Sequence, residues 1–297
     1  MLAATRTAGS EADSAGTQAR LRPIWLCADD YGISPSVDRG IRDLLMRGRL
    51  NATSVMVVAP SFDRSAAASL KALNAGTRRF AIGLHVTLTA PFEPLSPGFR
   101  PGRAGRFLPL FEMLLRGGLR LQDRDRLAIE IARQFKAFVT SFGRAPDFID
   151  GHQHVHLFPQ VRDAFLEIVK DVSPNAWVRQ CGRAATLPRQ WSDRKAVLLD
   201  SLSRSFRTRA TAAGIRTNPA FAGTYDFAKV ADSDFARLFP GFLRHLPSQS
   251  VVMCHPGFVD AELERLDPLT AQRETEYRYL ADDEFPAILE ANGVVLA

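Results

Sequence analysis

The sequence predicts an α/β protein, specifically a distorted (β/α) barrel of about seven parallel strands. Short apolar runs alternate with amphipathic segments along the 297 residues, which is the pattern of strands that alternate with helices. Roughly seven or eight such units follow one another in a single chain, and that number favours a barrel. A doubly wound open sheet is the alternative, because its strands and helices alternate in the same way.

The first predicted unit starts at Pro23. Residues 23–30 (PIWLCADD) are expected to form a buried strand that ends in two acids. The following helix has Ser34 as its N-cap and Pro35 at its first position, where the missing N–H of proline costs nothing. Its apolar residues fall on one face at helical spacing: Val37, Ile41, Leu44 and Leu45.

The later units follow the same alternation. Residues 53–60 and 80–89 are predicted strands, separated by a helix through 61–74. A helix at 123–143 is closed by Gly143. The stretch 148–160 (FIDGHQHVHLFPQ) is expected to form the fourth strand, with Pro159 opening the next helix. Further strand candidates lie at residues 175–180, 217–223, 249–257 and 293–297.

A single domain is expected at residues 23–297, preceded by a flexible leader at 1–22. The leader is rich in Ala, Ser, Thr and Gly and lacks the apolar core of a secretory signal. Residues 90–122 are rich in Pro, Gly and Arg and interrupt the alternation. Because long irregular insertions in compact domains tend to be functional, we expect this one to form a lid or a substrate wall.

Composition and cysteine content predict a cytoplasmic protein. Hydrophobic residues make up 46% of the chain and charged residues 24%, which is ordinary for a globular protein. The three cysteines include no CxxC pair and are too few for a disulfide framework, so a reducing compartment fits best. No apolar run approaches the roughly 20 residues of a membrane-spanning helix.

The basic charge predicts no nucleic-acid partner. The net charge is +6 and the pI about 9.6, but the arginines are scattered along the chain, whereas nucleic-acid binders concentrate them in a stripe or motif. The densest basic run, residues 200–216, is expected to be a solvated helix or loop. Alternatively, this basic run contacts phosphate or the surface of an anionic membrane. At most peripheral membrane contact is therefore expected.

Four polar motifs stand where predicted strands end: ADDYG, GLHVT, DGHQHVH and MCHPG. In a parallel barrel the C-terminal ends of the strands form the active face. One acid or histidine at a strand end is often a satisfied structural group, but four such motifs are hard to explain as core. They predict one polar site assembled from four strands.

Asp29 and Asp30 predict a cation in that site. Adjacent residues of a strand point to opposite faces, but at a strand end the backbone turns and both side chains can approach one site. Two close carboxylates repel each other unless a cation or a proton lies between them, so a divalent metal is a natural partner. The alternative is that one of the two acids caps the turn toward Ser34.

Three of the six histidines alternate within five positions, at His152, His154 and His156. Strand geometry places them on one side, whereas a helix would pair only His152 with His156. The distance between them along one strand is too long for all three to bind one ion. We therefore expect one or two to contact a metal, while the others hold the substrate or orient the ligands.

His85 and His255 complete the candidate site. Asp30, His85 and His152 together would form an Asp-His-His set with open positions for water, as in hydrolytic metal sites. His255 is a candidate general acid, because imidazole donates protons near neutral pH. Cys254 precedes it, but in a strand its side chain should point away from His255.

The ordered set of four motifs resembles the YdjC-type carbohydrate deacetylases, a family that includes chito-oligosaccharide deacetylases and hopanoid-associated deacetylase-like proteins. The resemblance runs from Ile24 to the end of the chain and rests on CADDYG, GLHVTLT, DGHQHVH and MCHPGF. AGTYDF (222–227) and QRETEYRYL (272–280) add weaker support. One departure is Val251, which stands four residues before His255 where members of the family often carry an acid.

The resemblance implies a deacetylase-like barrel that removes acetyl groups from N-acetylated sugars with one divalent metal ion, magnesium, zinc or similar. Asp30, His85 and His152 would hold the ion, Asp29 would be the general base and His255 the general acid. The remaining candidates, for substrate binding or for support of the ligands, are His154, His156, Arg179 and Tyr225.

The predicted partner is an N-acetylated sugar, free or lipid-linked, and a homodimer is compatible with such a barrel. Two other readings remain open on the same residues. One is a metal-dependent phosphoesterase or other amidohydrolase, since Asp/His metal centres serve several chemistries. The other is a sugar- or lipid-binding relative without turnover.

Overall fold

The computed structural model describes residues 21–77, 79–184, 194–227 and 232–297. The strands in chain order are β1 (Arg22–Tyr31), β2 (Ala52–Val55), β3 (Ala81–Val86), β4 (Phe148–Gly151), β5 (Trp177–Val178), β6 (Phe221–Ala222), β7 (Val251–Cys254) and β8 (Val294–Leu296). The α-helices are α1 (Pro35–Met46), α2 (Arg64–Asn74), α3 (Leu110–Gly118), α4 (Arg124–Phe142), α5 (Val161–Val172), α6 (Arg194–Ala212), α7 (Asp232–Leu243), α8 (Ala261–Leu266), α9 (Ala271–Ala281) and α10 (Phe285–Ala291).

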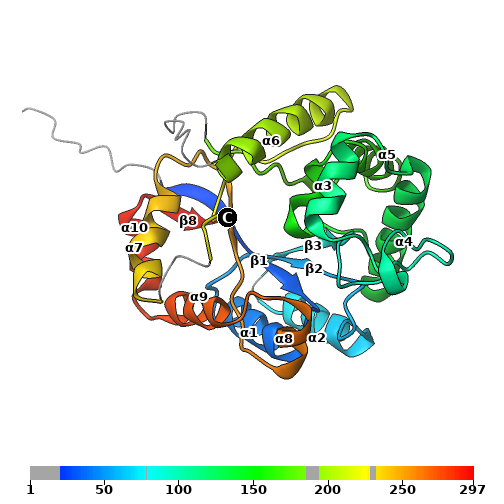
Figure 1. The fold of residues 1–297 in the computed structure, drawn as a ribbon. Helices are drawn as coiled ribbons and strands as arrows, with labels where there is room; N and C mark the ends of the chain where they lie inside the picture. Colours follow the sequence, from blue (N-terminus) through cyan, green and yellow to red (C-terminus); the bar gives the residue numbers. More distant parts are fainter. Residues whose placement is uncertain (1–20, 78, 185–193, 228–231) are drawn as a thin grey trace, which may run out of the picture.

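All strand pairs are parallel, and the strand order is β5-β4-β3-β2-β1-β7-β6, with β8 beside β1. Strands β1 to β5 follow one another across the sheet, and β7 and β6 continue it on the other side of β1, so the order is circular apart from β8. An isolated parallel bridge between Val178 and Thr217 links β5 to the segment that leads into β6. The helices surround the strands (Figure 1). The predicted distorted barrel is confirmed, and the doubly wound alternative is not adopted.

The helix ends follow the chemistry of their sequences. The Ser34 side chain caps α1 by accepting a hydrogen bond from the Val37 N–H at 3.3 Å, and Pro35 is the first helical residue, as predicted. Asp123 caps α4, and Gly143 ends it in the left-handed conformation with φ 70°. These caps fix where the chain leaves each helix for the next strand.

The segment 90–122 is less irregular than its composition predicts. It contains a 3-10 turn at Arg103–Gly105 and the helix α3, which packs against the histidine segment that follows β4. Glu130 of α4 holds the start of the segment by accepting hydrogen bonds from the Leu95 and Ser96 N–H groups at 3.0 and 2.8 Å. The insertion is thus a folded segment that packs beside the barrel.

The histidine stretch was predicted as a strand, and this prediction is wrong from His152 onward. Strand β4 ends at Gly151, and His152–Leu157 forms a 3-10 segment in which Gln153 and His154 have φ of 53° and 59°. The period-2 alternation of the histidines therefore does not put them on one side of a strand. Each of the three rings lies in a different environment.

Residues 1–20 of the predicted leader lie outside the described residues, and β1 begins at Arg22. Among the helices of the described ranges, none combines the length and the hydropathy needed to cross a membrane.

Candidate active site

Asp29 and Asp30 reach one site because β1 is irregular at its C-terminal end. Asp30 has a left-handed φ of 69°, and the pairing of β1 with β2 shifts register between Ala28 and Tyr31. This bulge breaks the alternation that would otherwise send the two side chains to opposite faces. Both carboxylates are buried, with exposed fractions of 2% and 1%.

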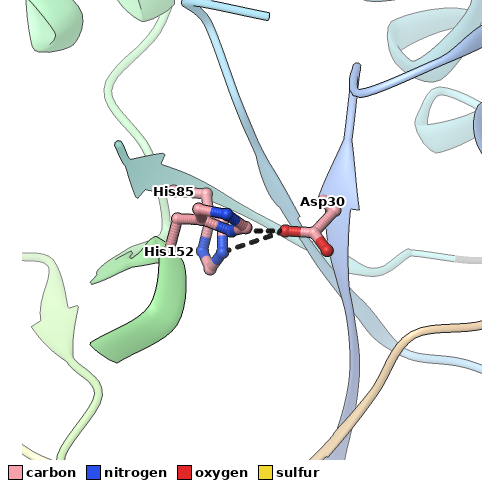
Figure 2. A group of neighbouring side chains, drawn as sticks. All are labelled: Asp30, His85 and His152. Atoms are coloured by element: carbon pink, nitrogen blue, oxygen red, sulfur yellow. Dashed lines mark hydrogen bonds and ion pairs between the residues drawn. The ribbon is translucent and has the colours of Figure 1, made fainter. Parts of the chain in front are cut away.

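Asp30, His85 and His152 lie together at the ends of three strands, β1, β3 and β4 (Figure 2). The Asp30 Oδ1 atom is 3.0 Å from His152 Nδ1 and 3.3 Å from His85 Nε2. One ligand atom from each residue lies within 4.8 Å of the others, and all three side chains are buried. The structure thus brings together the Asp-His-His set that the sequence predicts.

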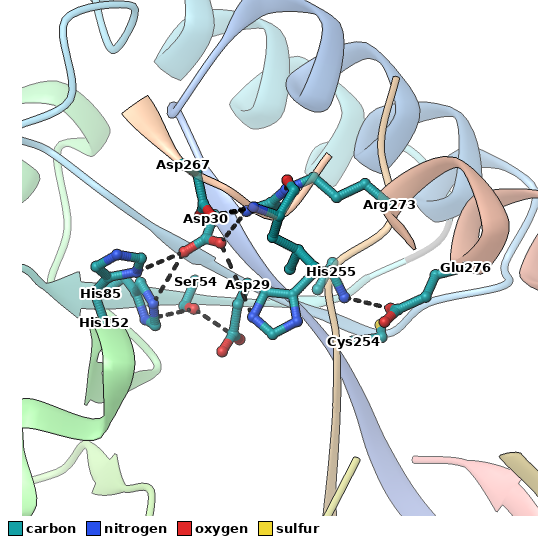
Figure 3. A network of polar contacts seen from close by, with 12 residues as sticks. Asp29, Asp30, Ser54, His85, His152, Cys254, His255, Asp267, Arg273 and Glu276 are labelled. Atoms are coloured by element: carbon teal, nitrogen blue, oxygen red, sulfur yellow. Dashed lines mark hydrogen bonds and ion pairs between the residues drawn. The ribbon is translucent and has the colours of Figure 1, made fainter. Parts of the chain in front are cut away.

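The second oxygen of Asp30 is held by Arg273 of α9, whose Nη2 donates to Oδ2 at 2.7 Å (Figure 3). Asp267 accepts from the same nitrogen at 3.0 Å. Burial alone would raise the pKa of Asp30, but His152 and Arg273 outweigh it and hold the pKa well below its usual range. Asp30 is therefore a carboxylate with Oδ1 directed at the two imidazoles.

His85 lies between two acids. Its Nε2 faces Asp30, and its Nδ1 lies 2.6 Å from Asp150 Oδ1 and 3.0 Å from the Ser54 hydroxyl. Burial lowers the pKa of His85, but Asp150 and Asp29 overcome this and raise the pKa to about 10. Without a metal the ring is therefore an imidazolium at neutral pH, and Asp150 fixes its orientation.

Asp29 is paired with Arg179, which follows β5. Arg179 Nη1 donates to Asp29 Oδ2 at 2.6 Å and Nη2 donates to Oδ1 at 2.7 Å. Burial alone would raise the pKa of Asp29, but Arg179 and then His85 outweigh it, so the pKa lies far below its usual range. Asp29 is therefore held as a carboxylate in a fixed orientation.

His255 follows β7 on the other side of Asp30, with Nε2 3.9 Å from Asp30 Oδ2. Its backbone N–H donates to Glu276 Oε2 at 2.6 Å, and the Tyr225 hydroxyl donates to Glu276 Oε1 at 2.6 Å. Burial raises the pKa of Glu276, although His255 opposes the shift. Glu276 from α9 thus supplies an acid near His255, while Val251 is buried within β7.

The Cys254 thiol is not placed to act as a nucleophile in this site. Its sulfur lies 3.4 Å from the Cys27 carbonyl oxygen inside the barrel, and burial raises the pKa of the thiol well above its usual value. A buried protonated thiol is a poor nucleophile.

The donor atoms fit a divalent metal ion. One carboxylate oxygen and two imidazole nitrogens are the ligands of many hydrolytic sites, and they suit zinc, manganese, cobalt or nickel. His85 and His152 come from consecutive strand ends and Asp30 from β1, so the set is held on rigid elements. The Asp150 contact with His85 is the kind of outer support that orients a metal-binding imidazole.

Comparison with known proteins identifies the family. The sequence profile of the YdjC-like proteins matches residues 23–291, which is most of the chain. This protein belongs to the YdjC-like family. The resemblance predicted from the four motifs is therefore confirmed.

Relatives of this YdjC-like chain include two proteins named chitooligosaccharide deacetylase. The one from Klebsiella pneumoniae is 29% identical over 263 residues, which cover 84% of this chain and 91% of the relative. The one from Salmonella paratyphi B is 28% identical over 276 residues, which cover 92% and 96%.

Solved structures show the same fold. A proposed cellobiose-phosphate cleavage protein from Enterococcus faecalis matches with a TM-score of 0.69 and 23% identity over 93% of this chain and 97% of its own. The lactam utilization protein of Thermus thermophilus matches with a TM-score of 0.51 and 13% identity over 93% and 98%. At these identities the likeness concerns the fold alone.

The other two histidines of the YdjC-like motif lie outside the Asp-His-His set. The His156 Nε2–H donates to the Arg179 carbonyl oxygen at 2.8 Å, and burial keeps the pKa of His156 well below its usual value. His154 Nδ1 lies 3.4 Å from the Cys181 sulfur, and burial followed by Arg179 lowers the pKa of His154 to about 3. Both rings are neutral, and His156 positions the backbone of Arg179.

Sequence reasoning did not assign roles to several residues that complete the network. Asp150 had a signal, because it opens the DGHQHVH motif directly after a buried strand. Arg273 and Glu276 lie in the QRETEYRYL stretch that supported the resemblance, but nothing local linked them to Asp30 or His255. The remaining members are Ser54 and Asp267.

Proposed function

We propose that this protein is a divalent-metal-dependent hydrolase that removes the N-acetyl group from an acetamido sugar, either an oligosaccharide or a glycolipid headgroup. The observation that carries the proposal is that Asp30 meets His85 and His152, while His255 lies 3.9 Å from Asp30 and Asp29 is close enough to His85 and His255 for both to lower its pKa. A base, an acid and a metal-binding set in one site are what metal-assisted amide hydrolysis uses. The relatives named chitooligosaccharide deacetylase support the choice of an acetylated sugar.

Asp30, His85 and His152 would hold the ion. When bound there, the ion supplies Lewis-acid polarisation of the acetyl carbonyl and lowers the pKa of a water molecule. Arg273 keeps Asp30 Oδ2 occupied, which leaves Oδ1 for the ion. Asp150 keeps the His85 ring in place.

Asp29 would act as the general base. Its depressed pKa means that it enters the reaction as a carboxylate over the whole neutral range. Arg179 holds both of its oxygens, so the carboxylate cannot rotate away from the attacking water. Arg179 would thus position the base.

His255 would act as the general acid. Its side chain is 13% exposed, so it borders the open side of the site. Glu276 fixes the backbone at this position and Tyr225 fixes Glu276. From there the imidazole can donate a proton to the departing amine of the sugar.

The test is acetate release from N-acetylglucosamine compounds that are free, oligomeric or lipid-linked. The protein is assayed as purified, after chelation, and after the addition of zinc, magnesium or manganese. We expect metal-dependent acetate that disappears in Asp29→Asn, and the best substrate identifies the sugar. Acetate that persists in the chelated protein or in Asp29→Asn would refute the proposed chemistry.

A further inference from the structure

Arg179 lies between two buried carboxylates. Besides its two bonds to Asp29, its Nη2 forms an ion pair with Asp150 Oδ2 at 2.7 Å. The three side chains are at most 3% exposed. Two carboxylates this deep in a protein require countercharge, and the guanidinium provides a permanent one.

The same two acids belong to a second group of potential metal ligands. Asp29, His85 and Asp150 each offer a ligand atom, and these atoms lie within 4.8 Å of one another. His85 belongs to both groups, since Nε2 faces Asp30 and Nδ1 faces Asp150. The chain therefore carries donor atoms for a second divalent ion beside the first.

We propose that Arg179 is a built-in cation that fills this second group and keeps the metal centre mononuclear. A guanidinium matches carboxylates at two points, carries one permanent positive charge and cannot act as a Lewis acid. In its presence Asp29 serves as the base and Asp150 positions His85, and neither binds a second ion. Arg179 thus determines how many ions the site holds.

The surroundings of Arg179 fix it in this place. Its N–H donates to the Ile149 carbonyl oxygen at 3.1 Å, and its own carbonyl oxygen accepts the His156 Nε2–H at 2.8 Å. The guanidinium carbon lies 5.9 Å from the ring centroids of both Phe148 and Phe221. The hydrogen bonds fix the backbone of Arg179, and the two rings flank its guanidinium. The side chain therefore stays between the two carboxylates and does not make room for an ion.

This inference rests on the proposed metal site and narrows its substrates. Phosphoester hydrolysis commonly uses two metal ions and cationic side chains that clamp the phosphate. Here Nη1 and Nη2 of Arg179 both contact carboxylates, and Nε is buried. A mononuclear centre whose Arg179 is engaged by carboxylates favours a neutral acyl group over a phosphate.

The experiment measures zinc per chain after equilibrium dialysis at saturating zinc. The wild type is compared with Arg179→Met, which keeps most of the side-chain length without the charge. We expect about one ion in the wild type and about two in Arg179→Met. The double variant Arg179→Met/Asp29→Asn, which lacks one ligand of the second group, should again bind about one zinc ion per chain.

Loading with manganese gives a second readout, because two adjacent ions couple and broaden the electron paramagnetic resonance spectrum.

The outcomes separate the inference from the proposed function. A folded Arg179→Met that still binds about one ion overturns the role of Arg179 and leaves the proposed hydrolase intact. A wild type that binds no ion removes the basis of both. If Arg179→Met does not fold alone, it is refolded with and without zinc: recovery with zinc supports the inference, because the ion replaces the lost countercharge, and no recovery contradicts it.

Discussion

His85 Nδ1 lies 2.6 Å from Asp150 Oδ1, so the ring that offers Nε2 to a metal is oriented from behind by a buried carboxylate. Replacing that carboxylate with an amide should weaken metal binding without removing a ligand. We expect Asp150→Asn to bind zinc about 10- to 100-fold more weakly, measured by calorimetric titration. The matched control is Asp147→Asn, three residues earlier, where the acid is exposed and pairs with Arg144. Equal affinities in the two variants would contradict the role of Asp150.

Zinc binding should release protons. In the metal-free protein the pKa of His85 is raised to about 10, so Nε2 carries a proton at neutral pH that a metal must displace. Titrations at pH 7.5 in buffers with different ionisation enthalpies should give heats that indicate release of about one proton per ion. His85→Gln should abolish most of this buffer dependence. Heats that are independent of the buffer would show that His85 is already neutral.

The metal-free protein should lose stability in alkaline solution. The pKa of His85 is raised above its ordinary value of 6.5, so its stabilising contribution is complete below pH 6.5 and is lost as the pH rises through about 10. Urea unfolding of the chelated protein at pH 7 and pH 10 should therefore show a lower free energy of unfolding at pH 10. The decrease should be smaller in His85→Gln, and an equal decrease in both proteins would assign it to other groups.

His255→Gln should lower kcat about 10²- to 10⁴-fold while KM and zinc affinity change little, because only proton donation to the leaving amine is removed. His245→Gln is the control, since His245 is exposed and lies two residues after the end of α7. Kinetics of acetate release measure both constants. A loss that appears in KM alone would make His255 a substrate-binding residue.

The site residues that lie at strand ends could be predicted from the sequence. Asp30, His85 and His152 lie at or just after the ends of β1, β3 and β4, so a parallel barrel brings them together once its strand order is known. The caps of α1 and the end of α4 at Gly143 were predictable for a similar reason, because they depend on residues a few positions apart.

The parts that were missed depend on long-range contacts or on unusual backbone. Arg273 meets Asp30 across 243 residues of sequence, and no local pattern encodes that pairing. The strand predicted through the histidines fails because Gln153 and His154, which directly follow His152, adopt left-handed conformations. Alternating residues indicate a strand only where the strand stays hydrogen-bonded to its neighbour. Here β4 ends at Gly151, one residue before the first histidine.

The circular strand order also sets the sequence of events during synthesis. Strand β1 carries Asp29 and Asp30, yet two of its neighbours are β7 and β8, whose residues leave the ribosome more than 200 positions later. A nascent chain therefore holds its two acids on a strand that cannot yet complete its pairing. Strand β1 is synthesised first but gains its last partners at the end of synthesis. The site around Asp29 and Asp30 should therefore form only when nearly the whole domain has been translated.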